Sequence, residues 1–455
     1  MENKTITPTL LLSIVATGLL SFSGVVIETA MNITFPHLMK VFGASLSSIQ
    51  WLTTSYLLVL SIMMPLSAYF KQRFETKKLF VIAASFFLGG LLVDALAPNL
   101  PILIMGRVLQ GVGTGISLPM MFNIILEQAP RHQQGLLIGV GNFITATAPA
   151  IGPTFGGMLV DSSLGWRSIF WVIIPVVAIA LIIGVVSIQQ YSEIKYIKLD
   201  ITGWLNLSLL FSFLILALTQ LGQQTGWVLI FGCLALIFLV LTIFWYKKVD
   251  SPIIKLSLFK NSWFSGHLIA FMLCQFEVMG LAFLLPNLVQ ILLGKTSFVA
   301  GLTMLPGAVL GAFLAPIGGN LLDKYGAVKP ILAGISLETI GVIIFLSVFQ
   351  NSSVIMLAGV YMIFTLGQGI SVPNVLTSGL SKMNLKDKAD GNAMFNTLQQ
   401  FAGAAGTSII SIIIATDHTS HQLYGFNHGL VTLTIGLLID LGVLVTVFAV
   451  NKVRA

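Results

Sequence analysis

The sequence predicts an all-α membrane protein of fourteen transmembrane helices, arranged as two six-helix bundles with an inserted two-helix hairpin. The 455-residue chain is 56% hydrophobic and 9% charged, which leaves too few polar side chains to cover a soluble globule of this size. One phrase also recurs: residues 113–119 read Gly-Thr-Gly-Ile-Ser-Leu-Pro, and residues 367–373 read Gly-Gln-Gly-Ile-Ser-Val-Pro. Duplicated membrane domains of this kind are typical of secondary transporters.

Apolar stretches of about 18 to 25 residues, long enough to cross a hydrocarbon core as helices, alternate with short polar connectors. The predicted spans are 10–33, 49–70, 79–97, 101–122, 135–158, 167–188, 201–221, 227–246, 263–288, 298–321, 329–348, 354–378, 392–415 and 428–450.

The repeat divides the chain into three parts. Pro36 aligns with Pro286 and Pro65 with Pro316, which places helices one to six opposite helices nine to fourteen. The predicted domains are an N-terminal six-helix bundle at 1–190, a hairpin insert with its connectors at 191–260, and a C-terminal six-helix bundle at 261–455. Substrate is expected between the two bundles.

The basic residues predict the orientation. With both termini in the cytoplasm, nineteen Lys and Arg residues face inward, three face outward (Lys40, Arg167 and Lys295), and Arg107 lies inside a helix. The net charge of +7 is therefore a topology signal and not evidence for nucleic-acid binding. We expect a multi-pass cell-membrane protein, a monomer in contact with lipid, without metal or cofactor.

Two charged residues lie inside predicted helices at similar depth, Glu28 in the first and Arg107 in the fourth. An unpaired charge in mid-membrane costs about 3 kcal/mol, so each should face a partner or a cavity. One interpretation is a static ion pair between the two helices. The interpretation we favour is that Glu28 binds and releases a proton beside Arg107, with a cationic substrate competing for it.

The remaining intramembrane acids receive different expectations. Glu277 aligns within one residue of Glu28, so we expect it to face the same cavity from the other half and to take part in proton coupling. A hydrogen-bonded structural role is predicted for Glu338 and Asp440. Asp94 lies near an outer helix end and is expected to reach water.

Three motifs resemble the major facilitator superfamily, specifically its fourteen-helix drug:proton antiporters of the EmrB/QacA type. Residues 27–36 (Ile-Glu-Thr-Ala-Met-Asn-Ile-Thr-Phe-Pro) are similar to the family's acid-Thr-x-x-Asn-x-x-x-Pro signature, and residues 107–113 to its Arg-x-x-Gln-Gly-x-Gly motif, whose arginine is implicated in proton transfer. Gly141 followed by residues 149–157 (Pro-Ala-Ile-Gly-Pro-Thr-Phe-Gly-Gly) resembles the motif associated with exporters. The resemblance covers essentially the whole chain.

Conformational change is predicted at two places. Proline removes backbone donors and glycine permits close helix approach, so the fifth helix is expected to act as a hinge. The alternative is that these residues serve tight packing alone. The loop at 319–326 resembles the superfamily's Gly-x-Leu-x-Asp-Arg-x-Gly motif, and its acid is expected to latch neighbouring helices in one conformation. The equivalent loop at 68–75 has Gln72 in place of Asp, so the N-terminal latch is lost, or is weaker and rebuilt around Glu75. The hinge and gate residues predicted are Gly141, Pro149, Gly152, Pro153, Gly156, Gly157, Asp323 and Gly326.

The substrate cavity is predicted to be aromatic and Met-rich, suited to flat lipophilic cations. Its candidate residues are Asn32, Trp51, Tyr56, Gln110, Met120, Phe143, Phe271, Met272, Phe276 and Phe283. A packing role is expected for the two cysteines, Cys233 and Cys274.

The function predicted from these features is proton-coupled multidrug efflux by alternating access, without enzymatic chemistry. No Gly-x-x-x-x-Gly-Lys-Ser/Thr loop occurs in the sequence, so an ion gradient should supply the energy. Two alternatives remain open. One is an exporter or importer of a single endogenous solute such as a lipid, fatty acid or metabolite. The other is a non-transporting membrane sensor or scaffold, suggested by the altered loop at Gln72.

Overall fold

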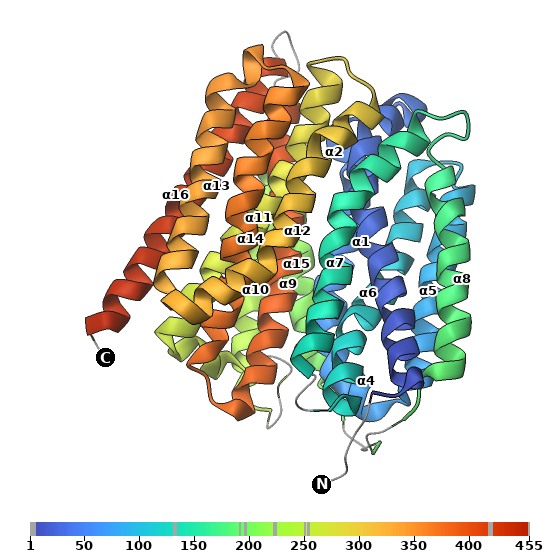
Figure 1. Ribbon diagram of the computed structural model, residues 1–455, viewed down its shortest axis with the longest axis vertical. Helices are drawn as coiled ribbons and strands as arrows, with labels where there is room; N and C mark the ends of the chain where they lie inside the picture. Colours follow the sequence, from blue (N-terminus) through green and yellow to red (C-terminus); the bar gives the residue numbers. More distant parts are fainter. Residues whose placement is uncertain are drawn as a thin grey trace.

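The computed structural model describes residues 6–130, 134–190, 193–194, 198–221, 225–249, 252, 255–416 and 422–453, which are helical almost throughout. The long helices run side by side (Figure 1), and together with two short ones they make sixteen α-helices in the described residues. They are α1 (Pro8–Phe42), α2 (Leu46–Ile49), α3 (Trp51–Met63), α4 (Ser67–Arg73), α5 (Thr76–Leu96), α6 (Leu100–Gln128), α7 (Gln134–Val160), α8 (Ser168–Ser187), α9 (Ile201–Thr219), α10 (Thr225–Tyr246), α11 (Ser262–Ile291), α12 (Ser297–Tyr325), α13 (Val328–Val348), α14 (Val354–Ser381), α15 (Leu385–Thr416) and α16 (Gln422–Val453). Short 3₁₀ turns at Met64–Leu66, Leu256–Lys260 and Phe349–Asn351 complete the elements.

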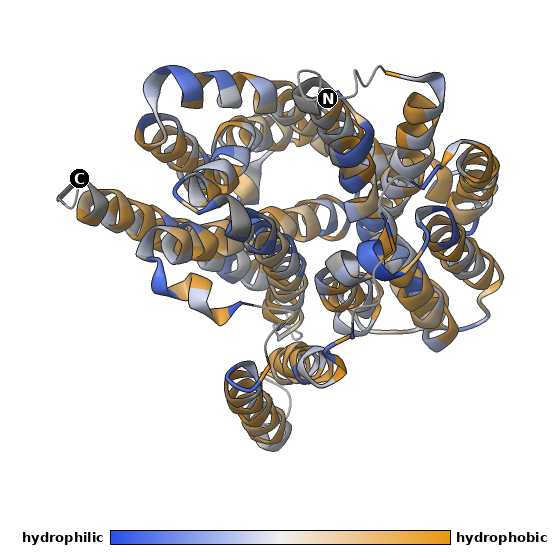
Figure 2. Cartoon of the chain, turned by 90° about the horizontal axis from the view of Figure 1, so that it is seen from below, coloured by the Kyte–Doolittle hydropathy of each residue, from blue (hydrophilic) through white to orange (hydrophobic). Residues whose placement is uncertain are grey.

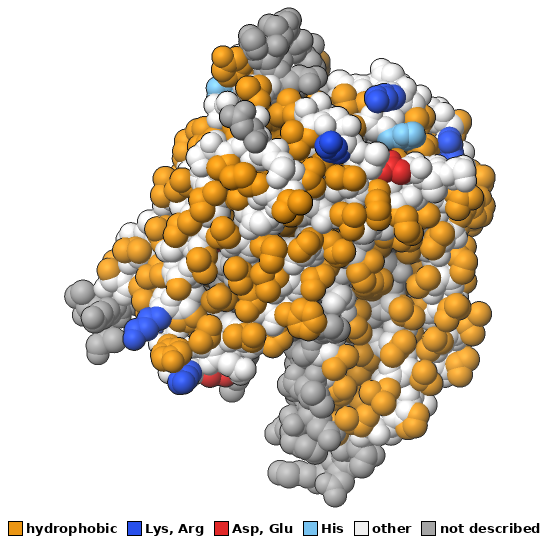
Figure 3. Space-filling model, turned by 45° about the horizontal axis from the view of Figure 1, so that its top comes forward, with side chains coloured by type: hydrophobic (Ala, Val, Ile, Leu, Met, Phe, Trp, Pro, Cys, Tyr) orange, Lys and Arg blue, Asp and Glu red, His pale blue; other side chains and the backbone are white. Residues whose placement is uncertain are grey.

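Most of these helices are long enough to span a membrane. Within the described residues, thirteen segments are long and apolar enough to cross a membrane. Helix α7, 27 residues long, lies at the fifth predicted span. The chain is therefore a multi-pass membrane protein, as its composition indicates, while fourteen crossings stay a prediction. Hydrophobic side chains cover the long flank of the molecule, and charged residues gather near its two ends (Figure 3).

Helix ends follow local sequence signals. Thr7 caps α1 by accepting from the Leu10 amide at 3.2 Å, and Asn99 caps α6 by accepting from the Ile102 amide at 3.1 Å. Gly43 ends α1 with φ of +60°, and Gly326 ends α12 with φ of +74°, a region that side chains disfavour. The predicted need for glycine at 326 thus has a conformational basis.

Two of the differences between the predicted spans and the helices of the structure involve proline. Helix α1 continues from the predicted end at 33 through Pro36 to Phe42. Membrane helices tolerate proline because neighbouring helices re-satisfy the freed backbone groups. The predicted span 49–70 is instead divided, since the 3₁₀ turn containing Pro65 separates α3 from α4.

The same helix pairing recurs in the two halves of the chain. In the first half α1 packs on α6, α7 and α8, and α5 on α6 and α8; in the second, α11 packs on α14, α15 and α16, and α13 on α14 and α16. Seen end-on, the helices form two neighbouring groups (Figure 2). The sequence repeat is thus a structural repeat, with α7·α12 mirrored by α15·α3 across the seam between the halves.

Helices α9 and α10 form the hairpin between these halves. They pack on each other, and α9 also packs on α3 and α15. The Trp204 indole donates to the Ile62 carbonyl at 3.0 Å, and the Phe211 ring stacks on Phe401 at 4.9 Å. The hairpin therefore borders the seam from one side. The domain boundaries near 190 and 260 remain predictions.

Candidate functional site

The N-terminal half holds a buried polar network beside Glu28. Glu28, on α1, is 5% exposed, and its carboxyl interacts electrostatically with Arg107, on α6, which is fully buried. Glu28 makes no hydrogen bond or ion pair with other residues in the described ranges. The static ion pair weighed as one interpretation is therefore not formed in this conformation.

Arg107 is held by three other contacts. Its Nε donates to the Leu52 carbonyl at 3.2 Å, its Nη1 donates to Gln110 Oε1 at 2.5 Å, and its guanidinium carbon lies 4.3 Å from the centre of the Tyr56 ring. A cation over an aromatic face and against a carbonyl is stabilised without a formal counter-charge. These contacts fix the guanidinium at the junction of α3 and α6.

The network extends from Arg107 to Asp94. Gln110 Nε2 donates to Asp94 Oδ2 at 2.7 Å, so the amide side chain of Gln110 connects a cation to an acid. Asp94 is fully buried. The expectation that Asp94 reaches water is wrong, because α5 and α6 meet closely at Gly90 and Gly106, and a Cβ on Gly106 would overlap the Asp94 carboxyl.

Two atoms of the hydrogen-bonded chain Arg107–Gln110–Asp94 lack partners among the described residues. They are Arg107 Nη2 and Asp94 Oδ1, both buried. Arg107 is an electrostatic neighbour of Glu28, and its bond to Gln110 is independent of whether the Glu28 carboxyl carries a proton. The arrangement is thus suited to a carboxyl that changes charge while its cationic neighbour stays in place.

Glu277 lies in a different environment from the one predicted. It is fully buried within the C-terminal half, where its electrostatic neighbours are Glu338 and Asp440. A Cβ on Gly436 of α16 would overlap Glu277 Oε1. Repeat symmetry placed this residue by depth along α11, but the side chain points toward α16 and not into a cavity shared with Glu28.

The predicted cavity residues divide between several locations. Tyr56 is buried with Trp51 and Phe276 packed in the same cluster, where α3, α9, α11 and α15 meet. The Phe283 ring contacts Phe35 across the seam, with centroids 5.7 Å apart. These aromatic side chains therefore belong to the surfaces that the two halves present to each other.

Other candidates have structural partners of their own. Asn32 accepts from Thr53 Oγ1 at 2.8 Å, and Gln110 belongs to the Arg107 network. Phe271 packs edge-to-face on Phe395 in the core of the C-terminal half, which corrects its cavity assignment. Met272 is half-buried. The side chain of Phe143 lies outside the described residues.

Helix α7 packs tightly on α12 across the seam between the halves, and on α1 within its own half. A Cβ on Gly156 would lie 2.7 Å from the Ala30 carbonyl oxygen, and one on Gly157 would lie 2.6 Å from the Ser297 carbonyl carbon. A Cβ on Gly301 would approach Thr154 Cα to 2.7 Å. Small residues let these backbones meet, as in many membrane helix pairs.

The remaining hinge candidates lie along α7. Gly152 and Pro153 are buried, and a Cβ on Gly152 would lie 2.8 Å from the Val26 carbonyl oxygen of α1. Gly141 packs near Met121, and Pro149 is half-buried. Both prolines lie within the helix, and whether it bends there during transport stays a prediction.

Sequence analysis missed the acid at the end of this seam. Asp161 follows α7 directly, and its Oδ2 accepts from the Phe298 amide at 2.6 Å while Oδ1 accepts from the Ser297 amide at 3.3 Å. The side chain of Gln290 also donates to the Ile33 carbonyl at 2.9 Å, joining α11 to α1. These bonds close one end of the seam, the upper end in Figure 1 and the outer end in the predicted topology.

The predicted latch at the opposite end is not formed in this conformation. Asp323 is exposed and makes no hydrogen bond or ion pair in the part of the chain that the structure describes. Glu75 pairs with Lys78, three residues away, so it does not rebuild the N-terminal latch either.

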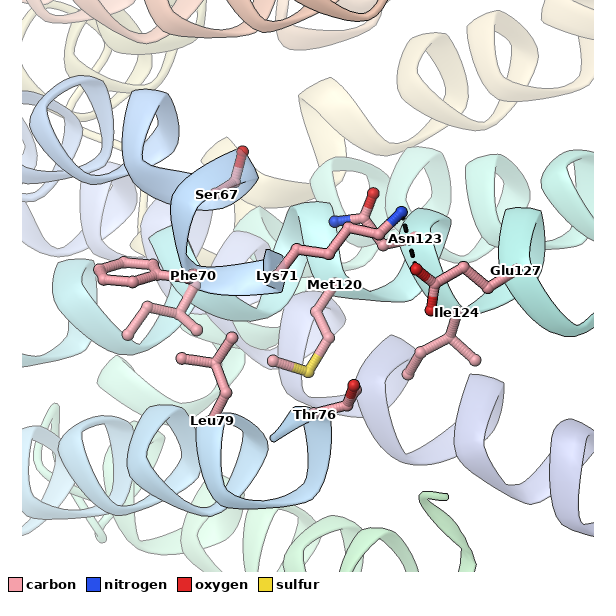
Figure 4. A pocket seen from close by; sticks show the side chains of 10 residues that line it. Ser67, Phe70, Lys71, Thr76, Leu79, Met120, Asn123, Ile124 and Glu127 are labelled. Atoms are coloured by element: carbon pink, nitrogen blue, oxygen red, sulfur yellow. Dashed lines mark ion pairs between the residues drawn. The ribbon is translucent and has the colours of Figure 1, made fainter. Parts of the chain in front are cut away.

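Lys71 instead pairs with Glu127 at 2.9 Å, joining α4 to α6 (Figure 4). The pair lies at a small pocket whose lining includes Met120, Asn123 and Phe70. Met120 therefore lies at this pocket and not with Tyr56. Because both partners belong to the first half, the pair does not tie the two halves together.

The comparisons with known proteins agree with this fold. The model of the Major Facilitator Superfamily matches residues 16–198 and 200–407. The chain belongs to this superfamily of transporters. A lincomycin resistance protein, LmrB of Listeria innocua, is 33% identical over 405 residues, which cover 88% of this chain and 86% of that protein. The riboflavin transporter RibZ of Clostridioides difficile is 28% identical over 396 residues, covering 87% and 86%.

Among solved structures, a bacterial homolog of the human lysosomal transporter Spinster, inward-facing and unoccupied, matches with a TM-score of 0.71. It covers 97% of this chain and 98% of that protein at 13% identity. This likeness establishes the predicted major facilitator fold.

Proposed function

We propose that the protein is a proton-coupled drug exporter of the fourteen-helix EmrB/QacA type, located in the cell membrane with both termini in the cytoplasm. The observation that carries this proposal is the buried Glu28 carboxyl beside Arg107, unpaired and 5% exposed. A carboxyl without a fixed partner can change its proton occupancy, whereas one locked in an ion pair holds its charge.

The seam supports alternating access between the two halves. Its predicted outer end is joined by Asp161 and Gln290, while Asp323 at the predicted inner end is free of partners in the described chain. This asymmetry fits a conformation that accepts substrate from the cytoplasm or inner leaflet. Protonation of Glu28 from outside would follow substrate release, and its deprotonation inside would complete the cycle.

The relatives favour drugs as the class of substrate. LmrB carries the name of a lincomycin resistance protein, and the aromatic cluster of Tyr56, Trp51 and Phe276 offers an apolar surface for a lipophilic compound. We infer a monomer surrounded by lipid, with protons and small lipophilic compounds as its ligands.

A single dedicated solute is the second candidate, favoured by the likeness to the riboflavin transporter RibZ. Everted membrane vesicles, in which the cytoplasmic face is outside, separate the two. The proposal expects several chemically unrelated lipophilic compounds to accumulate inside when a proton gradient is imposed, and an uncoupler to stop all of them.

Uptake of one compound alone would favour the dedicated-solute alternative. Accumulation that an uncoupler leaves unchanged would overturn proton coupling, and absence of any gradient-driven movement would favour a sensor or scaffold. Vesicles without the protein supply the background for each compound.

A further inference from the structure

A second group of buried acids lies in the C-terminal half. Glu28, Asp94 and Arg107 are not among the electrostatic neighbours of its members. Glu277 comes from α11, Glu338 from α13 and Asp440 from α16, and all three are fully buried. We call these three side chains the C-terminal carboxyl cluster. Its members interact electrostatically with one another.

Two neutral donors serve part of the cluster. Cys274 Sγ donates to Asp440 Oδ2 at 3.1 Å, and Ser371 Oγ, from α14, donates to Glu338 Oε1. Four helices thus contribute a polar group to one interior region, which a purely apolar bundle does not need.

Four of the six carboxyl oxygen atoms of the cluster are without partners among the described residues. Glu338 Oε2, Asp440 Oδ1 and both oxygens of Glu277 are buried and accept no hydrogen bond from the described residues. A purely structural acid should be satisfied, because a buried polar atom without a partner is costly. Glu277, with neither oxygen used, does not fit that role.

The surrounding backbone makes room for these side chains. A Cβ on Gly436, one turn before Asp440 on α16, would overlap Glu277 Oε1, and a Cβ on Gly367 would lie 2.7 Å from Glu338 Cγ. The space that these glycines leave is occupied by carboxyl groups and not by apolar side chains. The missing side chains of these two glycines therefore leave room for the carboxyl groups of Glu277 and Glu338.

The charge balance of the cluster points to its ligand. The titratable groups facing Glu277 are Glu338, Asp440 and, on its own helix, Cys274, so none of them brings a positive charge. No ion pair formed by the described residues includes a cluster member. Several adjacent negative charges in a buried site repel one another and lose hydration, and a proton bound by one of the carboxyl groups lowers both penalties.

A proton fits this cluster better than a metal ion does. The described residues contain no group of three or more acidic, His or Cys side chains that could hold a metal ion. We propose that the C-terminal carboxyl cluster is a second proton-binding site, with Glu277 as the residue that gains and loses the proton. Its use in transport rests on the proposed function, whereas proton binding itself does not.

Infrared spectroscopy of the purified protein in lipid nanodiscs tests proton binding without any substrate. The carbonyl stretching band of protonated carboxyl groups should be present near neutral pH and should weaken in Glu277→Gln. In Ser371→Ala, which keeps every acid but removes the donor to Glu338, the band should shift in position. The exposed Glu75→Gln is the matched control and should leave the band unchanged.

Identical protonated-carboxyl bands in wild type, Glu277→Gln and Ser371→Ala would overturn the proposal. In proteoliposomes that transport, the number of protons exchanged per substrate should fall in Glu277→Gln and stay at the wild-type value in Glu75→Gln. If the wild type shows no proton-driven transport but the infrared result holds, the proposed function fails and the second proton site stands.

Discussion

The Asp161 carboxylate accepts a 2.6 Å hydrogen bond from the backbone amide of Phe298, across the seam between the two halves. The Ser297 amide donates to the same carboxylate at 3.3 Å, so Asp161 from the first half caps the N-terminus of α12 in the second. A negative charge at a helix N-terminus satisfies free amides and meets the positive end of the helix dipole. The closed end of the seam thus depends on charge as well as on glycine packing.

Removing that charge should loosen the closed end. In Asp161→Ala the cap is lost, at about 0.5–2 kcal/mol. Spin labels on the exposed residues 40 and 295, one in each half, should show a broader distance distribution with longer distances in this variant. Glu75→Ala, in the N-terminal half and outside this cap, is the control. An Asp161→Ala distribution identical to that of wild type would show that the cap does not hold the seam closed.

Adding a methyl group inside the seam should disturb it more than removing the cap. A Cβ on Gly301 would lie 2.7 Å from Thr154 Cα, so Gly301→Ala forces α7 and α12 apart at a cost of about 1–3 kcal/mol. A lower unfolding temperature and slower export are expected. Gly359→Ala on α14, where nothing lies within 4 Å of the added Cβ, should match wild type in both measurements. Equal behaviour of the two variants would contradict the close approach.

The Gln110–Asp94 hydrogen bond gives a test of the Arg107 network. Asp94→Ala leaves the Gln110 amide without this acceptor and removes an electrostatic neighbour of Arg107, and we expect a loss of about 1–3 kcal/mol in stability. Asp94→Asn keeps an oxygen that can accept from Gln110 and should lose less. Thermal unfolding in detergent compares the two. If the alanine variant were as stable as the asparagine variant, the buried hydrogen bond would have no energetic role.

The Lys71–Glu127 ion pair should contribute little to stability. Its side chains are 34% and 19% exposed, and such pairs are worth about 0–1 kcal/mol. Lys71→Ala should therefore unfold within a few degrees of wild type. The charge-reversed double variant Lys71→Glu/Glu127→Lys should restore any loss. A large destabilisation of Lys71→Ala would mean that the lysine has a role beyond this pair.

The sequence was sufficient for the fold because its signals are long-range and redundant. Apolar spans set the helices, and the phrase shared by residues 113–119 and 367–373 revealed a repeat that recurs as equivalent helix pairs. Glu28 and Arg107 were found because charges inside apolar helices are rare enough to stand out.

The direction in which a side chain faces was harder to predict. Depth along α11 suggested that Glu277 matches Glu28, but the rotation of the helix turns it toward Gly436. Asp94 lies near a helix end and is nevertheless buried by the close approach of α5 and α6 at Gly90. Asp161 gave no periodic signal, because its role depends on a partner 137 residues away in the chain.

The most direct test of the central claim compares two kinds of transport in Glu28→Gln proteoliposomes. Glutamine keeps the size of the side chain but cannot gain or lose a proton at this position, so accumulation driven by a pH gradient should be abolished. Exchange of labelled for unlabelled substrate without a gradient should persist, since it needs only the alternating seam. Gradient-driven accumulation at the wild-type rate in Glu28→Gln would contradict the assignment of Glu28 as the proton carrier.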